Sequence, residues 1–197
     1  PMAAPDILGA SSGAAFGAAL AILCGLSTRL IMLAAFASGL VTVLVVYLVG
    51  QRAPGKRVVN LILAGIMVSS LFSAGTSFIK LVADPTNQLP AITYWLMGSL
   101  SGARMDDVSF AILPMAVGLV PLLLLRWRLN ILTLGDDEAR TMGVHANRLR
   151  LVVVLCSTLM TAASVSVSGM IGWVGLVIPH LSRKLVGSDP VSYTHLR

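Results

Sequence analysis

Residues 135–143 have the charge order of a short, capped helix that could bind a partner. Acidic residues open it, where the helix dipole is positive, and a basic residue lies towards its end. A final glycine supplies a natural C-terminal stop. The residues alone leave two interpretations open, a docking element for a soluble protein and a solvated connector. The segment consists of Gly135, Asp136, Asp137, Glu138, Ala139, Arg140, Thr141, Met142 and Gly143.

Glycines at every third position mark a second segment, near the end of the chain. Gly169, Gly172 and Gly175 strip one helix face of side chains, and Pro179 follows them. This spacing permits close helix packing or a break in the helix. His180 could be read as a proton relay or a metal ligand. It adjoins basic residues and has no second ligand nearby, so we favour a structural or interfacial histidine.

The small-residue run from Gly9 to Gly17 could pass for a glycine-rich phosphate loop. It lacks the lysine of a P-loop and follows no strand, so we interpret it as a close-packing helix face. The sequence contains no nucleotide-binding motif, and we expect no catalytic residue, no cofactor and no metal site. Cys24 and Cys156 lie in apolar runs without the spacing of a zinc site or a disulfide scaffold. We interpret both as small core residues.

The composition of the chain is very apolar, and it indicates which kind of element positions these segments. Of the 197 residues, 56% are hydrophobic and only 11% are charged, with a mean hydropathy of +0.89. A soluble domain usually carries about 25% charged residues, so this chain has too few charged residues to cover a water-facing surface. The net charge of +6 could suggest nucleic acid, but the basic residues occupy short loops between apolar runs. That arrangement is typical of a membrane protein. We expect a lipid bilayer as partner, and no nucleic acid.

Apolar runs long enough to cross a bilayer predict an all-α, polytopic transmembrane bundle. About 20 helical residues cross a hydrocarbon core of about 30 Å. The uncharged run 151–182 would form a helix of about 48 Å, so we divide it at its glycines. The six predicted spans are 7–28, 30–51, 58–79, 108–125, 151–168 and 171–185, within a domain covering 1–189. Residues 190–197 form an atypical tail that we treat as a possible artefact.

Residues 85–103 are also uncharged, but we predict a short helix at the membrane surface instead of a span. Pro85 and Pro90 interrupt the start, and Tyr94 and Trp95 suit the interface. With this choice, most of the 14 basic residues fall on one side, which the positive-inside rule places in the cytoplasm. That side holds Arg52, Lys56, Arg57, Arg126, Arg128, Arg140, Arg148, Arg150, Arg183 and Lys184. The other side holds Arg29, Lys80 and Arg104.

Five stretches, taken in order, resemble the permease family of ATP-binding-cassette importers for iron–siderophores, haem and cobalamin. They are PMAAPDILGASSGAAFGA at the start, LILAGIMVSSLFSAGTS at 61–77, YWLMGSLSGARMDD at 94–107, LGDDEARTMGVHANRLR at 134–150 and SGMIGWVGLVIPHLSRKLVGSD at 168–189. Each piece is weak alone, but the combination is specific. The resemblance implies ten spanning helices in the complete subunit, of which this chain carries the third to the eighth. After Asp189 the family pattern expects a basic residue and another span, and the tail departs from it.

The resemblance also implies partners. Residues 135–143 would dock on a cytoplasmic ATP-binding-cassette ATPase subunit, which would hydrolyse the ATP. Two permeases, identical or homologous, would pair around a central pathway, fed by an extracytoplasmic substrate-binding protein. The expected location is the bacterial cytoplasmic membrane. The substrate stays open, because pathway-lining positions such as Ser69, Ser70, Ser73 and Thr76 are not diagnostic.

Two other classes of function compete with an importer permease. The leading alternative is an ion-coupled secondary transporter, which commonly needs ionisable groups within the membrane. No carboxylate, lysine or arginine lies in the middle of a confident span, which argues against it. A membrane-embedded enzyme would need a convergent polar site within the spans, and the sequence indicates none. Uptake that needs internal ATP, instead of collapsing with an ionophore, separates the importer from the carrier.

Cysteine substitutions test the predicted topology. Gly55→Cys and Asn147→Cys should resist an impermeant thiol reagent in intact cells, because the basic loops stay in the cytoplasm. Asn87→Cys should react. Labelling at residue 147 together with protection at residue 87 would overturn both the orientation and the non-spanning helix in 85–103.

Overall fold

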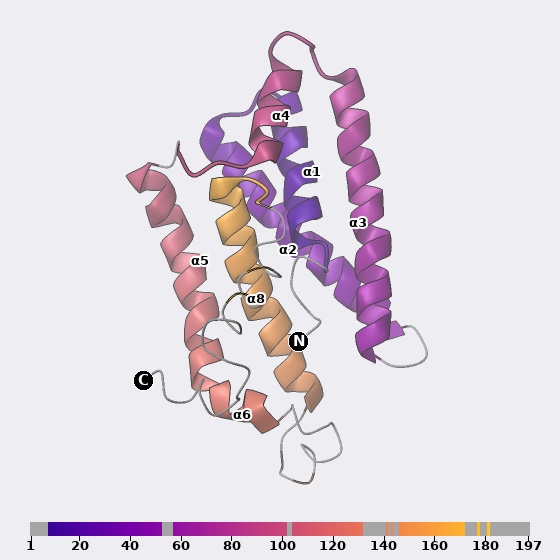
Figure 1. Cartoon of the computed structure of the whole chain (residues 1–197), viewed down its shortest axis with the longest axis vertical. Helices are drawn as coiled ribbons and strands as arrows, with labels where there is room; N and C mark the ends of the chain where they lie inside the picture. Colours follow the sequence, from indigo (N-terminus) through magenta and orange to yellow (C-terminus); the bar gives the residue numbers. More distant parts are fainter. Residues whose placement is uncertain are drawn as a thin grey trace.

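The computed structural model is a bundle of helices, which confirms the predicted all-α class (Figure 1). It describes residues 8–52, 57–101, 104–131 and 146–171, together with residues 141, 143, 177 and 181. The helices are α1 (Ala10–Leu23), α2 (Thr28–Arg52), α3 (Arg57–Val82), α4 (Gln88–Met97), α5 (Met105–Leu124), α6 (Arg126–Ile131) and α8 (Ala146–Ser168).

Four helices among the described residues, α2, α3, α5 and α8, are long and apolar enough to cross a membrane. They lie over the predicted spans 30–51, 58–79, 108–125 and 151–168. The predicted span 171–185 and the tail 190–197 lie almost wholly outside the described part of the chain. Charged residues of the four long helices occur near their ends, which fits a bilayer interior that penalises charge.

The first predicted span, 7–28, is longer than the helix that the structure contains. Helix α1 has 14 residues and ends at Leu23, so it is about 21 Å long. Gly25 follows with a φ of +67°. Its N–H donates to the carbonyl of Ile22 at 2.9 Å, and the N–H of Leu26 donates to that of Ala21 at 3.0 Å. This Schellman motif ends the helix.

Helix α4 is short, with ten residues, as predicted for 85–103. One side of it packs into the bundle beside α1 (Figure 1), and its position relative to the membrane stays a prediction. Ile92 is completely buried against Ala19, Ile79 and Ala83. Trp95 packs against a cluster of small α1 and α2 residues, whereas Tyr94 is exposed. The buried side chains of α4 account for its position against the bundle better than the preference of aromatic rings for the membrane interface does.

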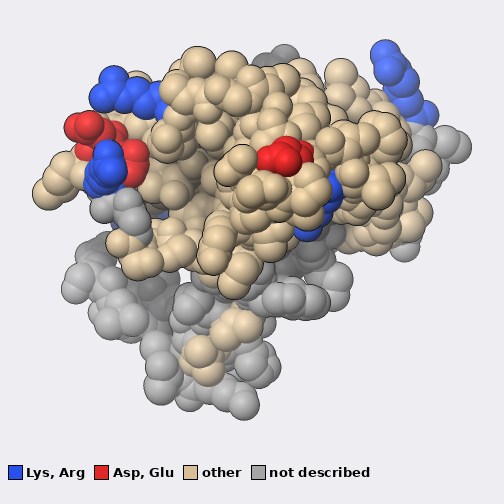
Figure 2. Space-filling view, turned by 90° about the horizontal axis from the view of Figure 1, so that it is seen from above, with Lys and Arg blue, Asp and Glu red and all other residues tan. Residues whose placement is uncertain are grey.

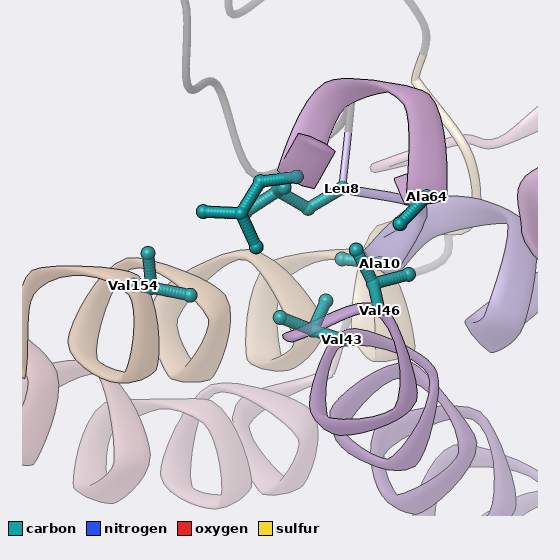
Figure 3. Close-up of a cluster of buried hydrophobic side chains, with 7 residues drawn as sticks. Leu8, Ala10, Val43, Val46, Ala64 and Val154 are labelled. Carbon is teal, nitrogen blue, oxygen red and sulfur yellow. The ribbon is translucent and has the colours of Figure 1, made fainter. Parts of the chain in front are cut away.

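Helix α1 lies at the centre of the bundle and contacts α2, α3, α4 and α8. Its buried positions carry only alanine, glycine and serine. One buried cluster around it joins Leu8 and Ala10 to Val43 and Val46 of α2, Leu61 and Ala64 of α3, and Val154 of α8 (Figure 3). Small side chains let several helices approach one axis closely. The run from Gly9 to Gly17 is therefore a packing face.

The closest approach joins α1 to α2. A Cβ atom on Gly13 would overlap the Thr42 side chain and lie 2.9 Å from the Ser38 carbonyl oxygen. A Cβ atom on Gly17 would overlap Ser38 Oγ. The two hydroxyls are bonded within α2, because Ser38 Oγ donates to the carbonyl of Ala34 and Thr42 Oγ1 to that of Ser38, both at 2.7 Å. Polar groups are thus satisfied inside an apolar contact.

Basic residues at the two ends of the bundle are grouped as the sequence predicted, and which end is cytoplasmic stays a prediction. Arg29 begins α2 and Arg104 precedes α5, and a 3.5 Å ion pair from Arg29 to Asp106 joins the starts of these helices. Arg52 and Arg126 lie at the opposite end (Figure 1). Figure 2 looks along the bundle from the first end, where most of the visible surface belongs to uncharged residues.

A leucine in place of a packing glycine tests the central role of α1. Gly17→Leu should lower the free energy of unfolding by about 1–3 kcal/mol or more, because α2 lies where the side chain must go. The measurement is thermal unfolding of the purified protein in detergent. Ala37→Leu, at an exposed position of α2, is the matched control and should stay within about 0.5 kcal/mol. Equal losses would show that α1 does not depend on close approach.

Candidate functional site

The predicted docking segment, 135–143, lies mostly outside the described residues. Thr141 is helical and exposed, and Gly143 is exposed with a φ of +76°. That left-handed conformation is the one glycine takes where a helix ends. The structure says nothing of the other predicted positions, so docking stays a prediction. They are Gly135, Asp136, Asp137, Glu138, Ala139, Arg140 and Met142.

The two long helices that flank this segment are tightly packed. Helix α5 leads into it through α6, and α8 leads away from it. Helices α5 and α8 lie side by side (Figure 1). A Cβ atom on Gly118 of α5 would lie 2.7 Å from Met160 Cγ and 2.8 Å from the Cys156 carbonyl oxygen of α8. A displacement of the segment would therefore move both helices together, since packed cores deform little.

The glycine break after the predicted span 151–168 is a point of backbone contact. Helix α8 ends at Ser168, and Gly169 has a φ of +71°. A Cβ atom on Gly169 would overlap the Trp95 carbonyl oxygen and lie 2.8 Å from the Gly98 Cα atom. The N–H of Ser99 donates to the Ser168 carbonyl at 2.7 Å. The end of α4 is thereby joined to the end of α8.

Gly98 takes part in this joint and was not singled out from the sequence. Gly98 has a φ of +67° and directly follows α4, so a glycine after an apolar run was the available signal. The other members of the predicted break, Gly172, Gly175 and Pro179, lie outside the described residues, as does His180.

The hydroxyls named as pathway positions do not share one face of α3. Thr76 is buried and Ser69 is half-buried, whereas Ser70 and Ser73 are exposed. Ser77 extends the exposed row and was not singled out from the sequence. Ser70 Oγ donates to the Ile66 carbonyl at 2.8 Å, and Ser77 Oγ to the Ser73 carbonyl at 3.0 Å. The row is a mildly polar stripe in which the hydroxyls of Ser70 and Ser77 bond to their own helix.

The two cysteines differ from the expectation that both are core residues. Cys24 is exposed, because α1 ends one residue before it, and Cys156 is half-buried on α8. Among the residues that the structure describes, no three His, Cys, Asp or Glu side chains gather where they could hold a metal ion.

Comparison with known proteins identifies the family that this chain resembles. The model of the FecCD transport family matches residues 1–194. The molybdate import system permease protein MolB of Haemophilus influenzae is 40% identical over 189 residues. The cobalamin import system permease protein BtuC of Halobacterium salinarum is 39% identical over 190 residues. The hemin transport system permease protein HmuU of Yersinia pestis is 35% identical over 198 residues.

A solved structure shares the fold as well. It is described as an inward-facing conformation and assigned to the metal-chelate type of ABC transporters, with a TM-score of 0.86 and 40% identity. The match covers 94% of this chain and 59% of the solved one. The three permeases are each matched over 96% of this chain and over 56%, 51% and 58% of their own lengths, respectively. The chain thus spans about half the length of these relatives.

Two alanine substitutions test the joint between α4 and α8. Gly25→Ala and Gly169→Ala both place a side chain at positive φ, which costs roughly 1–2 kcal/mol. Gly25 has no neighbouring atom within 4 Å, whereas Gly169 faces the α4 backbone. Gly169→Ala should therefore lower the thermal unfolding temperature clearly more than Gly25→Ala does. Equal shifts would mean that the α4 and α8 ends separate without cost.

Proposed function

Because this chain belongs to the FecCD transport family, we propose that its complete protein is the permease subunit of an ATP-driven importer. The observation that carries the proposal is a bundle with four membrane-length helices that superimposes on a metal-chelate type ABC transporter with a TM-score of 0.86. The resemblance stated from the sequence agrees with this family. The protein would be a multi-pass protein of the bacterial cytoplasmic membrane and would itself catalyse no reaction.

The proposed substrate is a metal chelate such as an iron–siderophore, haem or a cobalamin. Relatives named for hemin, cobalamin and molybdate support an anionic or metal-containing cargo without choosing among them. The exposed stripe of Ser70, Ser73 and Ser77 would form part of the pathway wall facing a second permease copy or homologue. The hydroxyls of Ser70 and Ser77 are bonded to their own helix and would compete weakly for cargo, so they would let a bulky chelate pass. An extracytoplasmic binding protein would deliver it.

Coupling to ATP would run through the packed helices. A cytoplasmic ATP-binding-cassette ATPase would bind residues 135–143 and move them during hydrolysis. Helix α8 is about 34 Å long; it is packed on α5 along its middle, around Cys156 and Met160, and is joined to α4 at its C-terminal end. A shift at the cytoplasmic end would therefore reach the opposite end of the bundle as a rigid-body movement.

A secondary transporter driven by ions is the alternative, and no specific observation favours it. The four long described helices carry their charged residues near their ends, away from the depth where coupling ions are usually bound. Vesicles with the full-length subunit, its ATPase and its binding protein decide between the two. Uptake should require internal ATP and survive an ionophore. Uptake that survives ATP depletion but fails with an ionophore would refute the importer.

A bulky substitution tests the docking role of 135–143. Ala139→Trp should leave membrane insertion intact, because it lies outside the spans, but should reduce ATPase co-purification or uncouple hydrolysis from uptake. Reversing both Glu138 and Arg140 should act in the same direction, although single exposed charges contribute only about 0–1 kcal/mol. The control is Leu124→Trp, at a 78% exposed position of α5. Full coupling in Ala139→Trp would refute the assignment.

A further inference from the structure

A groove runs between α2 and α5, with α8 as its floor. Its deeper part is a cavity of about 470 Å³ whose lining comes almost entirely from apolar side chains of these helices. Leu40 and Leu44 line it from α2, Val117 from α5, and Leu155 and Leu159 from α8. Helices α2 and α5 stay apart here, so the cavity opens sideways between them.

The upper part of the same groove is charged. A second cavity of about 360 Å³ lies between the first turns of α2 and α5 and is lined by Arg29, Leu33, Asp106 and Phe110, among others. Phe36 and Phe110 meet edge to face between the two cavities, with ring centroids 6.0 Å apart. The two rings touch across the groove, which therefore consists of two cavities in line: a charged one at its mouth and an apolar one beyond the rings.

The charges at the mouth have both signs and are open to a ligand. Arg29 and Asp106 are 3.5 Å apart, and their side chains are 85% and 79% exposed. Asp107 adds a second carboxylate, although its Oδ2 already accepts the backbone N–H of Arg104 at 2.9 Å. One guanidinium beside two carboxylates complements a headgroup that pairs an anionic phosphate with a cationic amine.

The groove also has the length of one bilayer leaflet. From Arg29 to Leu44, α2 rises about 22 Å. A leaflet with its headgroups is about 20–22 Å thick. A ligand with its headgroup at Arg29 would thus place its acyl chain against Leu40 and Leu44, and would end near the middle of the bilayer.

We propose that this groove binds one phosphatidylethanolamine molecule, with its phosphate at Arg29, its ammonium at Asp106 and an acyl chain between α2 and α5. The inference rests on the membrane location proposed above. A spanning helix from the rest of the protein is the competing occupant. An apolar span there would offer no polar partner of its own to the exposed charges at the mouth of the groove.

The test uses the full-length subunit in nanodiscs that contain phosphatidylethanolamine with a photoactivatable group in mid-chain. After irradiation, mass spectrometry should find lipid adducts on the α8 peptide that contains Leu155 and Leu159. Val117→Trp, which fills the groove, should abolish them. Leu119→Trp on the same helix is the control, because Leu119 does not line the groove, and it should leave them unchanged.

Headgroup recognition is tested in the same system. Unlabelled phosphatidylethanolamine should compete better than phosphatidylglycerol, and Asp106→Asn should remove that preference. Arg29→Gln should lower labelling about two- to fivefold, the range expected for an exposed ion pair. Equal competition by both lipids would show a non-specific lipid annulus and overturn the proposal, as would labelling that resists Val117→Trp. An absence of adducts would show that another span covers the groove. Resistance to alkaline extraction, measured in parallel, reports membrane location separately.

Discussion

The close approach of α1 to its neighbours is the constraint on which the rest of the bundle depends. In lipid, helices gain little from hiding apolar surface, so association relies on contact and on satisfied polar groups. Gly13 and Gly17 let α2 come so near that no β-carbon would fit, and the α2 hydroxyls at that contact bond to their own helix. The small central helix can then hold α2, α3, α4 and α8 at once.

The apolar runs predicted the helical class and the positions of four long helices, because hydrocarbon thickness sets helix length so strictly. They failed where a local motif decided the outcome. The C-terminus of α1 is set by Gly25 and by Gln88, whose Nε2 donates to the Leu23 carbonyl at 3.0 Å. Counting apolar residues cannot detect a bond between positions so far apart. The tertiary contacts of Ile92 were hidden from a single sequence for the same reason.

The candidate functional segments were only partly predictable. Charge order and Gly143 predicted a docking helix, which stays a prediction, and the glycine spacing marked the end of α8 without identifying its contact with α4. The meeting of Gly98 with Gly169 depends on how α4 folds back, which residue spacing does not encode. The exposed and buried hydroxyls of α3 became distinguishable only once one side of that helix was seen against α1.

The joint between α4 and α8 is made by main-chain atoms: a Ser99 N–H to Ser168 carbonyl bond and two glycines in contact. This joint requires glycine at two positions, but it does not depend on the chemistry of the side chains around it. Substitutions among the surrounding side chains can therefore occur while the main-chain link survives. In the importer proposed above, the side chains around the joint could therefore change while the ends of α4 and α8 stay connected.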